Sequence, residues 1–259
     1  MVLLGIETTG PFCSAALRIG NETHELISEK KLNHLASLIP MIRQLSEEEQ
    51  VDLKKLDAIC VSEGPGSFTG IRIGVSTGRA MSQILNIPIV SVPTLFAFAR
   101  SIALKAEEMY SDENSIKAES ARESEKFISC PIFNARRNQI YGAAYSGNTQ
   151  LVEDGPYMLD EFLERMKIAV KRKYGKIDES RICFAGDGVD AYEEFLKDRI
   201  PKAIIWKVYQ RASGICDTAL YMFSHKVEFQ SKLNLNPCDL KPNYMRMAEA
   251  QRKLMEGKL

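Results

Sequence analysis

The stretch LDAICVSEGPGSFTGIRIGVSTGRAMSQIL, residues 56–85, contains a strand, a tight turn and a helix in direct succession. Residues 56–62 form an apolar run typical of a buried strand. The glycines and proline that follow predict a turn, and the apolar spacing after the turn predicts a helix over residues 68–85. A strand that leads directly into a helix is the repeating unit of an α/β fold.

The turn within this stretch has Gly64 and Gly66 on either side of Pro65, followed by hydroxyls on Ser67 and Thr69. One of the two hydroxyls is expected to cap the helix. The segment matches neither the phosphate loop GxxxxGK[ST] nor a dinucleotide fingerprint, because no lysine follows to reach a phosphate. We therefore predict that the turn shapes a strand-to-helix corner and does not by itself bind a nucleotide.

The helix carries Gly70, Gly74 and Gly78 at every fourth position, so the three glycines line one face. Each glycine costs about 1 kcal/mol relative to alanine inside a helix, and close approach of another backbone is the expected compensation. That backbone belongs either to this chain's own sheet or to a helix of another subunit. Ile71 and Val75 flank the stripe, and a partner interface is the interpretation that we favour.

The rest of the chain repeats one order of elements, βββαβαβα, twice. The first half has strands expected at 2–7, 13–19, 23–28, 56–62 and 87–92, and helices at 32–49, 68–85 and 94–109. The second half has strands expected at 126–133, 139–146, 149–154, 181–186 and 203–209, and helices at 158–173, 189–199 and 213–229. The sequence thus predicts a duplicated, two-lobed α/β fold with mixed sheets flanked by helices.

We expect a first lobe over residues 1–108 that carries the partner interface, and a second over 109–210 that begins with a polar linker. The last helix, 211–229, is expected to pack back on the first lobe, and residues 230–259 form a C-terminal tail.

The amino-acid composition narrows the range of possible functions. Lysine plus arginine and aspartate plus glutamate both total 34, so the net charge is zero. A free-standing nucleic-acid binder usually has a basic surplus, so contact with nucleic acid would need a local patch or a basic partner. The sequence predicts no membrane-spanning segment and no signal peptide, and we expect a cytoplasmic protein with its six cysteines reduced.

Few residues are candidates for chemistry in a cleft between the lobes. Glu7, Thr8 and Thr9 follow the first strand and could meet a phosphate or a metal-bound water, or could form a hairpin that satisfies its own backbone. Asp187, in the turn before a helix, is the other candidate for nucleotide binding. His34 has Leu38 where a helical metal pair would need a second histidine, so no metal site is predicted.

Five segments carry a resemblance to a known family: LGIETTGPFCSAAL, HLASLIPMI, GPGSFTGIRIG, NARRNQIYGAAY and KPNYMR. In them the sequence resembles the bacterial TsaB (YeaZ) family, strongly over the first hundred residues and in pieces afterwards. The resemblance implies the duplicated fold of actin, sugar kinases and heat-shock ATPases. It also implies work on N6-threonylcarbamoyladenosine (t6A), next to the anticodon of tRNAs that read codons starting with A.

Members of this family serve as the non-catalytic partner that TsaD, the catalytic subunit, needs for threonylcarbamoyl transfer, and the ATPase TsaE joins them. The resemblance thus implies tRNA contact through the complex, no tightly bound cofactor, ATP or ADP as a candidate ligand at the partner interface, and a homodimer as an alternative when the chain is alone. Glu7 departs from the aspartate usual in the family, which leaves nucleotide binding open. The expected partner-interface residues, on two helices, are His34, Leu38, Ile42, Gly70, Ile71, Gly74, Val75 and Gly78.

Two other functions stay open. The first is a cleft enzyme, a glycoprotease-like peptidase or nucleotide hydrolase, with Glu7 and Asp187 as its only carboxylate candidates. The second is direct tRNA contact through the basic tail, residues 240–259.

Overall fold

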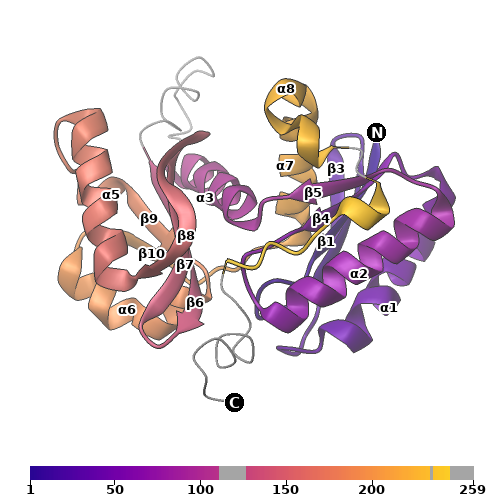
Figure 1. The fold of residues 1–259 in the computed structure, drawn as a ribbon, viewed down its shortest axis with the longest axis horizontal. Coiled ribbons are helices and arrows are strands. Elements are labelled where there is room, and N and C mark those ends of the chain that lie inside the picture. Colours follow the sequence, from indigo (N-terminus) through magenta and orange to yellow (C-terminus); the bar gives the residue numbers. More distant parts are fainter. Residues whose placement is uncertain (111–126, 234–235, 246–259) are drawn as a thin grey trace, which may run out of the picture.

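The computed structural model describes residues 1–110, 127–233 and 236–245. Its elements follow the predicted βββαβαβα order twice (Figure 1). The first half contains β1 (Val2–Glu7), β2 (Ser14–Ile19), β3 (Glu22–Ile27), α1 (His34–Glu48), β4 (Ala58–Ser62), α2 (Phe68–Leu85), β5 (Ile89–Val92) and α3 (Thr94–Tyr110). The second half contains β6 (Ile128–Arg136), β7 (Gln139–Ser146), β8 (Thr149–Met158), α5 (Leu159–Tyr174), β9 (Ile182–Ala185), α6 (Asp187–Arg199), β10 (Ile204–Trp206) and α7 (Ala212–Ser224), with the short α8 (Lys226–Phe229) after it.

Each half forms one five-stranded mixed sheet, with the orders β3-β2-β1-β4-β5 and β10-β9-β6-β7-β8. In the first sheet β1, β2 and β3 are antiparallel neighbours, and β4 and β5 continue the sheet parallel to β1. The second sheet repeats this pattern, with β9 and β10 parallel to β6. The two sheets therefore confirm the predicted duplication.

The first sheet lies between two layers of helices. Side chains from β1, β4 and β5 form one core with α1 and α2 on one face. On the other face the same strands pack against α7. Because helices cover both faces, the central strands are apolar on both sides, which explains the continuous buried run of β4.

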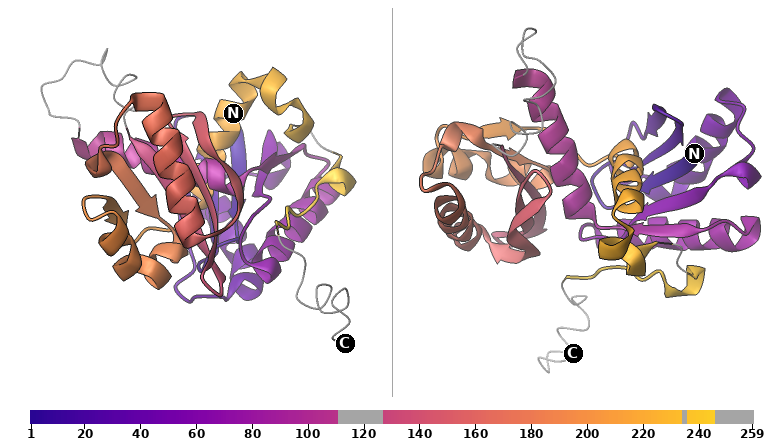
Figure 2. Two further views of the ribbon diagram at one scale, coloured as in Figure 1. Left: turned by 60° about the vertical axis from the view of Figure 1, so that its left-hand side comes forward. Right: turned by 90° about the horizontal axis from the view of Figure 1, so that it is seen from above.

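Helices α3 and α7 lie between the two sheets (Figure 2). Although α3 follows the first sheet in the sequence, Leu95, Phe98 and Ile102 pack on the second sheet against Phe133 and Ala143. The predicted boundary at residue 108 assigns this helix to the first lobe by chain order; most of its buried apolar side chains lie in the core of the second sheet, and Ala97 lies in that of the first. Sequence periodicity identifies an apolar face but does not say which sheet it covers.

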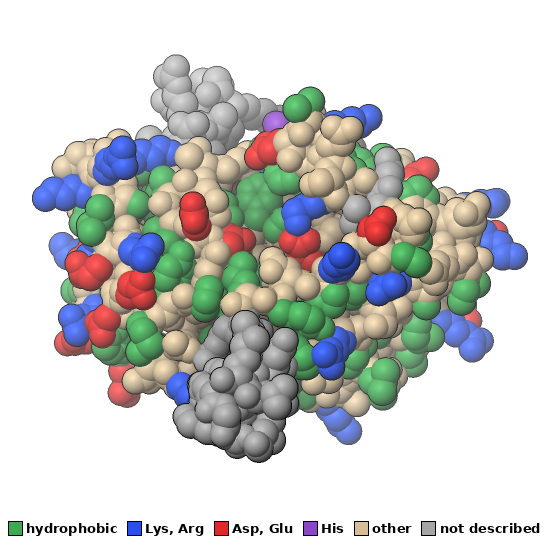
Figure 3. Space-filling model, in the orientation of Figure 1, with side chains coloured by type: hydrophobic (Ala, Val, Ile, Leu, Met, Phe, Trp, Pro, Cys, Tyr) green, Lys and Arg blue, Asp and Glu red, His purple; other side chains and the backbone are tan. Residues whose placement is uncertain are grey.

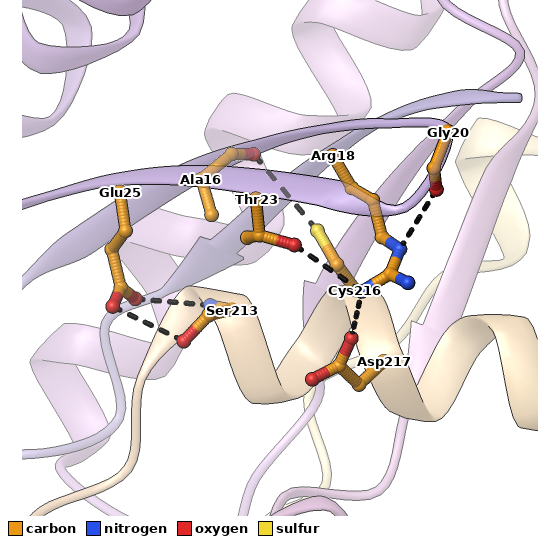
Figure 4. A network of polar contacts seen from close by, with 8 residues as sticks. All are labelled: Ala16, Arg18, Gly20, Thr23, Glu25, Ser213, Cys216 and Asp217. Carbon is orange, nitrogen blue, oxygen red and sulfur yellow. Dashed lines mark hydrogen bonds and ion pairs between the residues drawn. The ribbon is translucent and has the colours of Figure 1, made fainter.

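Polar contacts fix α7 to the first sheet (Figure 4). The Arg18 guanidinium on β2 forms an ion pair with Asp217. The backbone N–H of Ser213 donates to Glu25 on β3 over 2.9 Å. These contacts join residues 199 and 188 positions apart in the chain, and through them the last helix packs on the first lobe.

The C-terminal segment, residues 236–245, runs back along α2. The Asn243 N–H donates to the Glu63 carbonyl over 2.7 Å, and the Arg72 Nε donates to the Tyr244 hydroxyl over 2.9 Å. The Tyr244 ring packs on Phe68 with 4.8 Å between centroids. Residues 234–235 and 246–259 of the predicted tail, and all but the first residue of the predicted linker at 110–126, lie outside the described residues.

Candidate functional site

A cleft of about 550 Å³ opens between the lobes where β1, β4 and β6 end. From the first lobe it is lined by the loop after β1 and by the first residues of α2. From the second lobe it is lined by the end of β6 and the start of α6. Its lining residues are Thr9, Gly10, Pro11, Lys31, Leu32, Gly66, Ser67, Phe68, Thr69, Phe133, Asn134, Ala135, Arg136, Tyr141 and Asp187.

Of the four predicted nucleotide-binding residues, Thr9 and Asp187 line this cleft and Glu7 and Thr8 do not. Both the backbone N–H and the hydroxyl of Thr9 donate to Glu7 Oε1, over 2.5 Å and 2.6 Å. The Thr8 hydroxyl donates to the Gly70 carbonyl over 2.7 Å. Thr9 therefore bonds within the loop, whereas Thr8 bonds to the start of α2.

Glu7 is fully buried, and burial raises its pKa to about 7 despite the hydrogen bonds from Thr9. Its second carboxylate oxygen has no hydrogen-bond partner. A carboxyl group in this setting is held largely neutral below neutral pH.

Asp187 stands at the beginning of α6, where its carboxylate accepts a hydrogen bond from the Asn134 N–H over 3.1 Å. Burial raises its pKa to about 6. Two cations of the same cleft, Lys31 and Arg136, were not singled out from the sequence. Arg136 belongs to a turn in which Arg136, Arg137 and Asn138 all have positive φ. The sequence NARRN, residues 134–138, is typical of a turn between strands, but nothing in it indicates a position at the cleft.

The predicted corner forms as expected after β4. Gly64 and Gly66 both have positive φ, and the Ser67 hydroxyl, not that of Thr69, caps α2 by accepting from the Gly70 N–H over 3.2 Å. The Ser67 N–H donates to the Thr9 carbonyl over 2.8 Å, so this corner and the loop after β1 form one unit at the edge of the cleft.

The glycine stripe of α2 faces this chain's own sheet. A Cβ on Gly70 would lie 1.9 Å from the Thr8 carbonyl oxygen, and one on Gly74 would lie 2.3 Å from the Thr8 hydroxyl. A Cβ on Gly78 would lie 2.5 Å from Val61. The stripe therefore packs on the first lobe itself, against backbone at Gly70 and against side chains at Gly74 and Gly78, and these glycines are not open to another subunit.

The other predicted interface residues are also inside the lobe. Leu38, Ile42, Ile71 and Val75 belong to the core between the helices and the sheet. His34 is buried, and its Nε2–H donates to the Gly10 carbonyl over 3.1 Å, while burial lowers the pKa of the ring. All eight named side chains and glycines thus hold α1 and α2 in place and do not form the outer surface of these helices.

The outer surface of these two helices, which we call the α1–α2 face, carries exposed apolar side chains among polar ones. Leu35 and Ile39 on α1 are 78% and 51% exposed, and Ile84 on α2 is 82% exposed. Leu32 and Phe68 extend this exposed apolar surface toward the cleft. In Figure 3 hydrophobic side chains are visible over α2 on the right-hand lobe. Exposed apolar side chains gathered on neighbouring helices are typical of a protein interface.

Most of the chain matches one family model and several named proteins. The family model described as "TsaD: tRNA N6-adenosine threonylcarbamoyltransferase" matches residues 25–252. The protein of Buchnera aphidicola (strain APS) named tRNA threonylcarbamoyladenosine biosynthesis protein TsaB is 30% identical over 170 residues, which cover 66% of this chain and 68% of that protein. The Bacillus subtilis protein of the same name is 28% identical over 99% of both chains.

A solved structure of YeaZ from Pseudomonas aeruginosa has a TM-score of 0.64 and 20% identity, and the match covers 94% of this chain and 99% of that one. A second structure from that organism, described as similar to peptidase YeaZ, has a TM-score of 0.65 and 21% identity over 95% of this chain and 99% of that one. At these identities the likeness concerns the fold. Taken with the family model and the named relatives, it shows that this chain belongs to the TsaB (YeaZ) family.

Proposed function

We propose that this chain is the non-catalytic partner subunit of a TsaD-type transferase in t6A biosynthesis. Its named relatives are TsaB proteins of tRNA threonylcarbamoyladenosine biosynthesis, which supports the pathway. The single observation that carries the partner role is the α1–α2 face, an exposed apolar surface on a lobe whose core is already complete. The same face would pair two copies of the chain when no partner is present.

The internal glycine stripe supports this proposal indirectly. Because Gly70 and Gly74 allow α2 to lie directly on Thr8, the apolar residues on the opposite side of the helix are held on a rigid base. A preorganised surface loses less conformational freedom on binding than a mobile one. TsaD-type transferase, TsaE-type ATPase and tRNA would then meet in one assembly.

The alternative cleft enzyme has less support. Glu7 does not line the cleft, and its one hydrogen-bonded oxygen is already shared between two groups of Thr9. Asp187 remains the one acidic residue in the cleft lining within the described chain. A lone carboxylate without a second acid, a nucleophile or a metal ligand beside it is a poor basis for hydrolysis.

A nucleotide at the joint between subunits remains part of the proposal. Its phosphates would meet Lys31, Arg136 and the Ser67 hydroxyl, all of which line the cleft beside the α1–α2 face. Calorimetric titration of ADP into the chain alone and into the complex tests this, and Lys31→Met should weaken any binding observed.

The decisive experiment for the partner role replaces Leu35 and Ile39 together by aspartate. Burying each side chain contributes roughly 1.5–3 kcal/mol, so each substitution should weaken pairing by about tenfold to a hundredfold. Size-exclusion chromatography with light scattering, using the TsaD-type protein of the same organism, measures pairing. A reconstituted transfer assay on a tRNA transcript measures function.

Val227→Asp is the matched control, because Val227 is 94% exposed on α8, away from this face. We expect the control to pair and to support transfer normally. If the Leu35 and Ile39 double variant, folded by circular dichroism, still pairs and supports full transfer, the α1–α2 face is not the partner surface.

A further inference from the structure

The C-terminal end of α5 carries a concentrated positive charge. The sequence there is KRKYGK, residues 171–176, and Lys171, Arg172, Lys173 and Lys176 are all exposed. Figure 3 shows blue side chains gathered at the upper left of the molecule, over the end of α5. We call these four residues the α5 basic patch. It lies on the second lobe, whereas the α1–α2 face lies on the first.

None of the four cations forms an ion pair within the described part of the chain. Cations elsewhere on the same lobe do: Lys197 pairs with Glu193, and Arg199 with Asp160. Unpaired like charges this close repel one another, which costs stability at low salt.

The helix dipole accounts for only part of this charge. Cations in the last turn of a helix are stabilised by the dipole, but the effect fades within that turn. Lys176 follows Gly175, which ends α5 with a φ of +76°, so Lys176 lies beyond the helix. Helix α1, by contrast, ends in acidic residues with no base in its last turn. Basic residues therefore do not occur at every helix C-terminus of this chain, and the concentration of positive charge at the end of α5 needs another explanation.

Two hollows flank the patch. A groove of about 580 Å³ between α5 and the edge strand β8 has three cations in its lining, Arg165, Arg172 and Lys173, and one acid, Glu153. The lining of a smaller hollow of about 280 Å³ includes Tyr174, the cations Lys176 and Arg181, and one acid, Asp178. Tyr174 is 39% exposed, and the Lys173 ammonium lies 5.4 Å from its ring centroid. Exposed cations interleaved with an aromatic ring are the combination that contacts phosphates and stacks on unpaired bases.

We propose that the α5 basic patch binds the phosphate backbone of RNA, and specifically the tRNA substrate of the pathway. This inference rests on the proposed role in t6A biosynthesis. A chain with no net charge can attract a polyanion only through such a local concentration of cations. A membrane surface fits less well, because the apolar residues of α5 (Phe162, Leu163, Met166 and Val170) are buried in the lobe and are not free to enter lipid.

The test replaces all four cations of the patch by glutamine in the full chain. The matched control replaces four other exposed lysines by glutamine, so that both proteins lose the same charge; the control positions are Lys54, Lys55, Lys202 and Lys226. Binding of a fluorescent tRNA transcript is measured at about 50 and about 200 mM salt, a range over which phosphate contacts lose affinity steeply.

If all four cations contact phosphates, the patch variant binds tRNA at least tenfold more weakly at the lower salt. The slope of log affinity against log salt becomes shallower by about three, at roughly 0.7–0.9 per contact. The control keeps the wild-type slope. Unchanged affinity and slope in the patch variant, or an equal loss in the control, would overturn the proposal.

Competition with polyglutamate of matched charge separates RNA from an acidic protein as the ligand. RNA binding predicts weak competition, and competition as strong as by unlabelled tRNA would assign the patch to an acidic protein instead. Pairing with the TsaD-type protein is measured on the same variants. A patch variant that pairs normally and also binds tRNA normally refutes the RNA contact and leaves the partner role untouched. The partner role is tested separately, by pairing of the Leu35 and Ile39 double variant.

Discussion

Glu7 provides the sharpest test of how the first lobe is held together. Its carboxyl group is fully buried at the end of β1, with a pKa raised by burial from 4.5 to about 7. Between these two pH values the folded chain binds a proton that the unfolded chain has released. The contribution of Glu7 to stability is therefore largest below about pH 4.5 and is lost as the pH rises through about 7.

The perturbation is Glu7→Gln, which keeps the shape and removes the titration. The carbonyl oxygen of the substituted side chain would accept the same two hydrogen bonds from Thr9, and its amide nitrogen would occupy the position of the oxygen that has no partner. A raised pKa of this size corresponds to about 3 kcal/mol, at 1.36 kcal/mol per pKa unit. Relative to wild type, the variant should thus gain about 3 kcal/mol of unfolding free energy between about pH 4.5 and about pH 8.

The assay is urea unfolding at both pH values, followed by circular dichroism and by amide hydrogen exchange in β1. Fluorescence is unsuitable because the only tryptophan, Trp206, lies in the second lobe. Comparing variant with wild type at each pH cancels the titration of other buried groups such as Asp187. Glu29→Gln, at an exposed position, is the control for which no such difference is expected.

A difference between Glu7→Gln and wild type that is the same at both pH values would refute this account of Glu7. The same variant also tests the enzyme alternative. If the isolated chain hydrolyses a nucleotide or peptide and Glu7→Gln abolishes that hydrolysis without unfolding the chain, Glu7 is a catalytic residue. We expect no such activity to depend on it.

Three further predictions concern packing. Gly70→Ala should lower the unfolding free energy by about 1–3 kcal/mol, although alanine favours helix by about 1 kcal/mol, because its Cβ would lie 1.9 Å from a backbone oxygen. The control, Ala80→Gly on the exposed side of α2, should cost only about 1 kcal/mol. A Gly70→Ala protein more stable than wild type would contradict the packing. Lys232→Met should lower the unfolding free energy, measured in urea, by about 1–3 kcal/mol because it leaves the buried Glu63 carboxylate without its cation at 2.6 Å. Adding Glu63→Gln should recover part of that loss. If the effects of the two substitutions simply add, the pair is not coupled. Tyr244→Ala should speed amide exchange in residues 236–245, because it removes a ring contact worth about 1 kcal/mol. Exchange in β6 should not change and is the internal control. Unaltered exchange in residues 236–245 would show that other contacts hold the segment.

Much of the fold follows from local sequence patterns. The predicted helix at 68–85 coincides with α2 because a capping serine marks its start and apolar spacing runs unbroken to its end. The predicted strand at 149–154 stops short of β8, which continues to Met158. Gly155 and Pro156 follow that range, and an edge strand tolerates proline because one side of its backbone needs no partner.

The direction of the glycine stripe could not be read from the sequence. Glycine at every fourth residue predicts that another part of a protein comes close to that face of the helix. The same spacing results whether the neighbour is Thr8 of this chain or a residue of a second chain. The cations that line the expected cleft could not be identified from the sequence either. Lys31 and Arg136 are more than a hundred positions apart and lie in loops without a shared motif, so only the packing of the two lobes brings them to one cavity.

The internal role of the glycines links the two candidate surfaces of the first lobe. The Thr8 hydroxyl donates to Gly70 on α2, and the Ser67 N–H donates to Thr9, so the start of α2 and the cleft loop move as one body. The outer side of that helix forms part of the α1–α2 face. A partner that shifted α2 on binding would therefore also shift Thr9 and Ser67 at the cleft. Coupling between a partner and a cleft ligand then needs no long pathway, because one rigid element is shared by both sites.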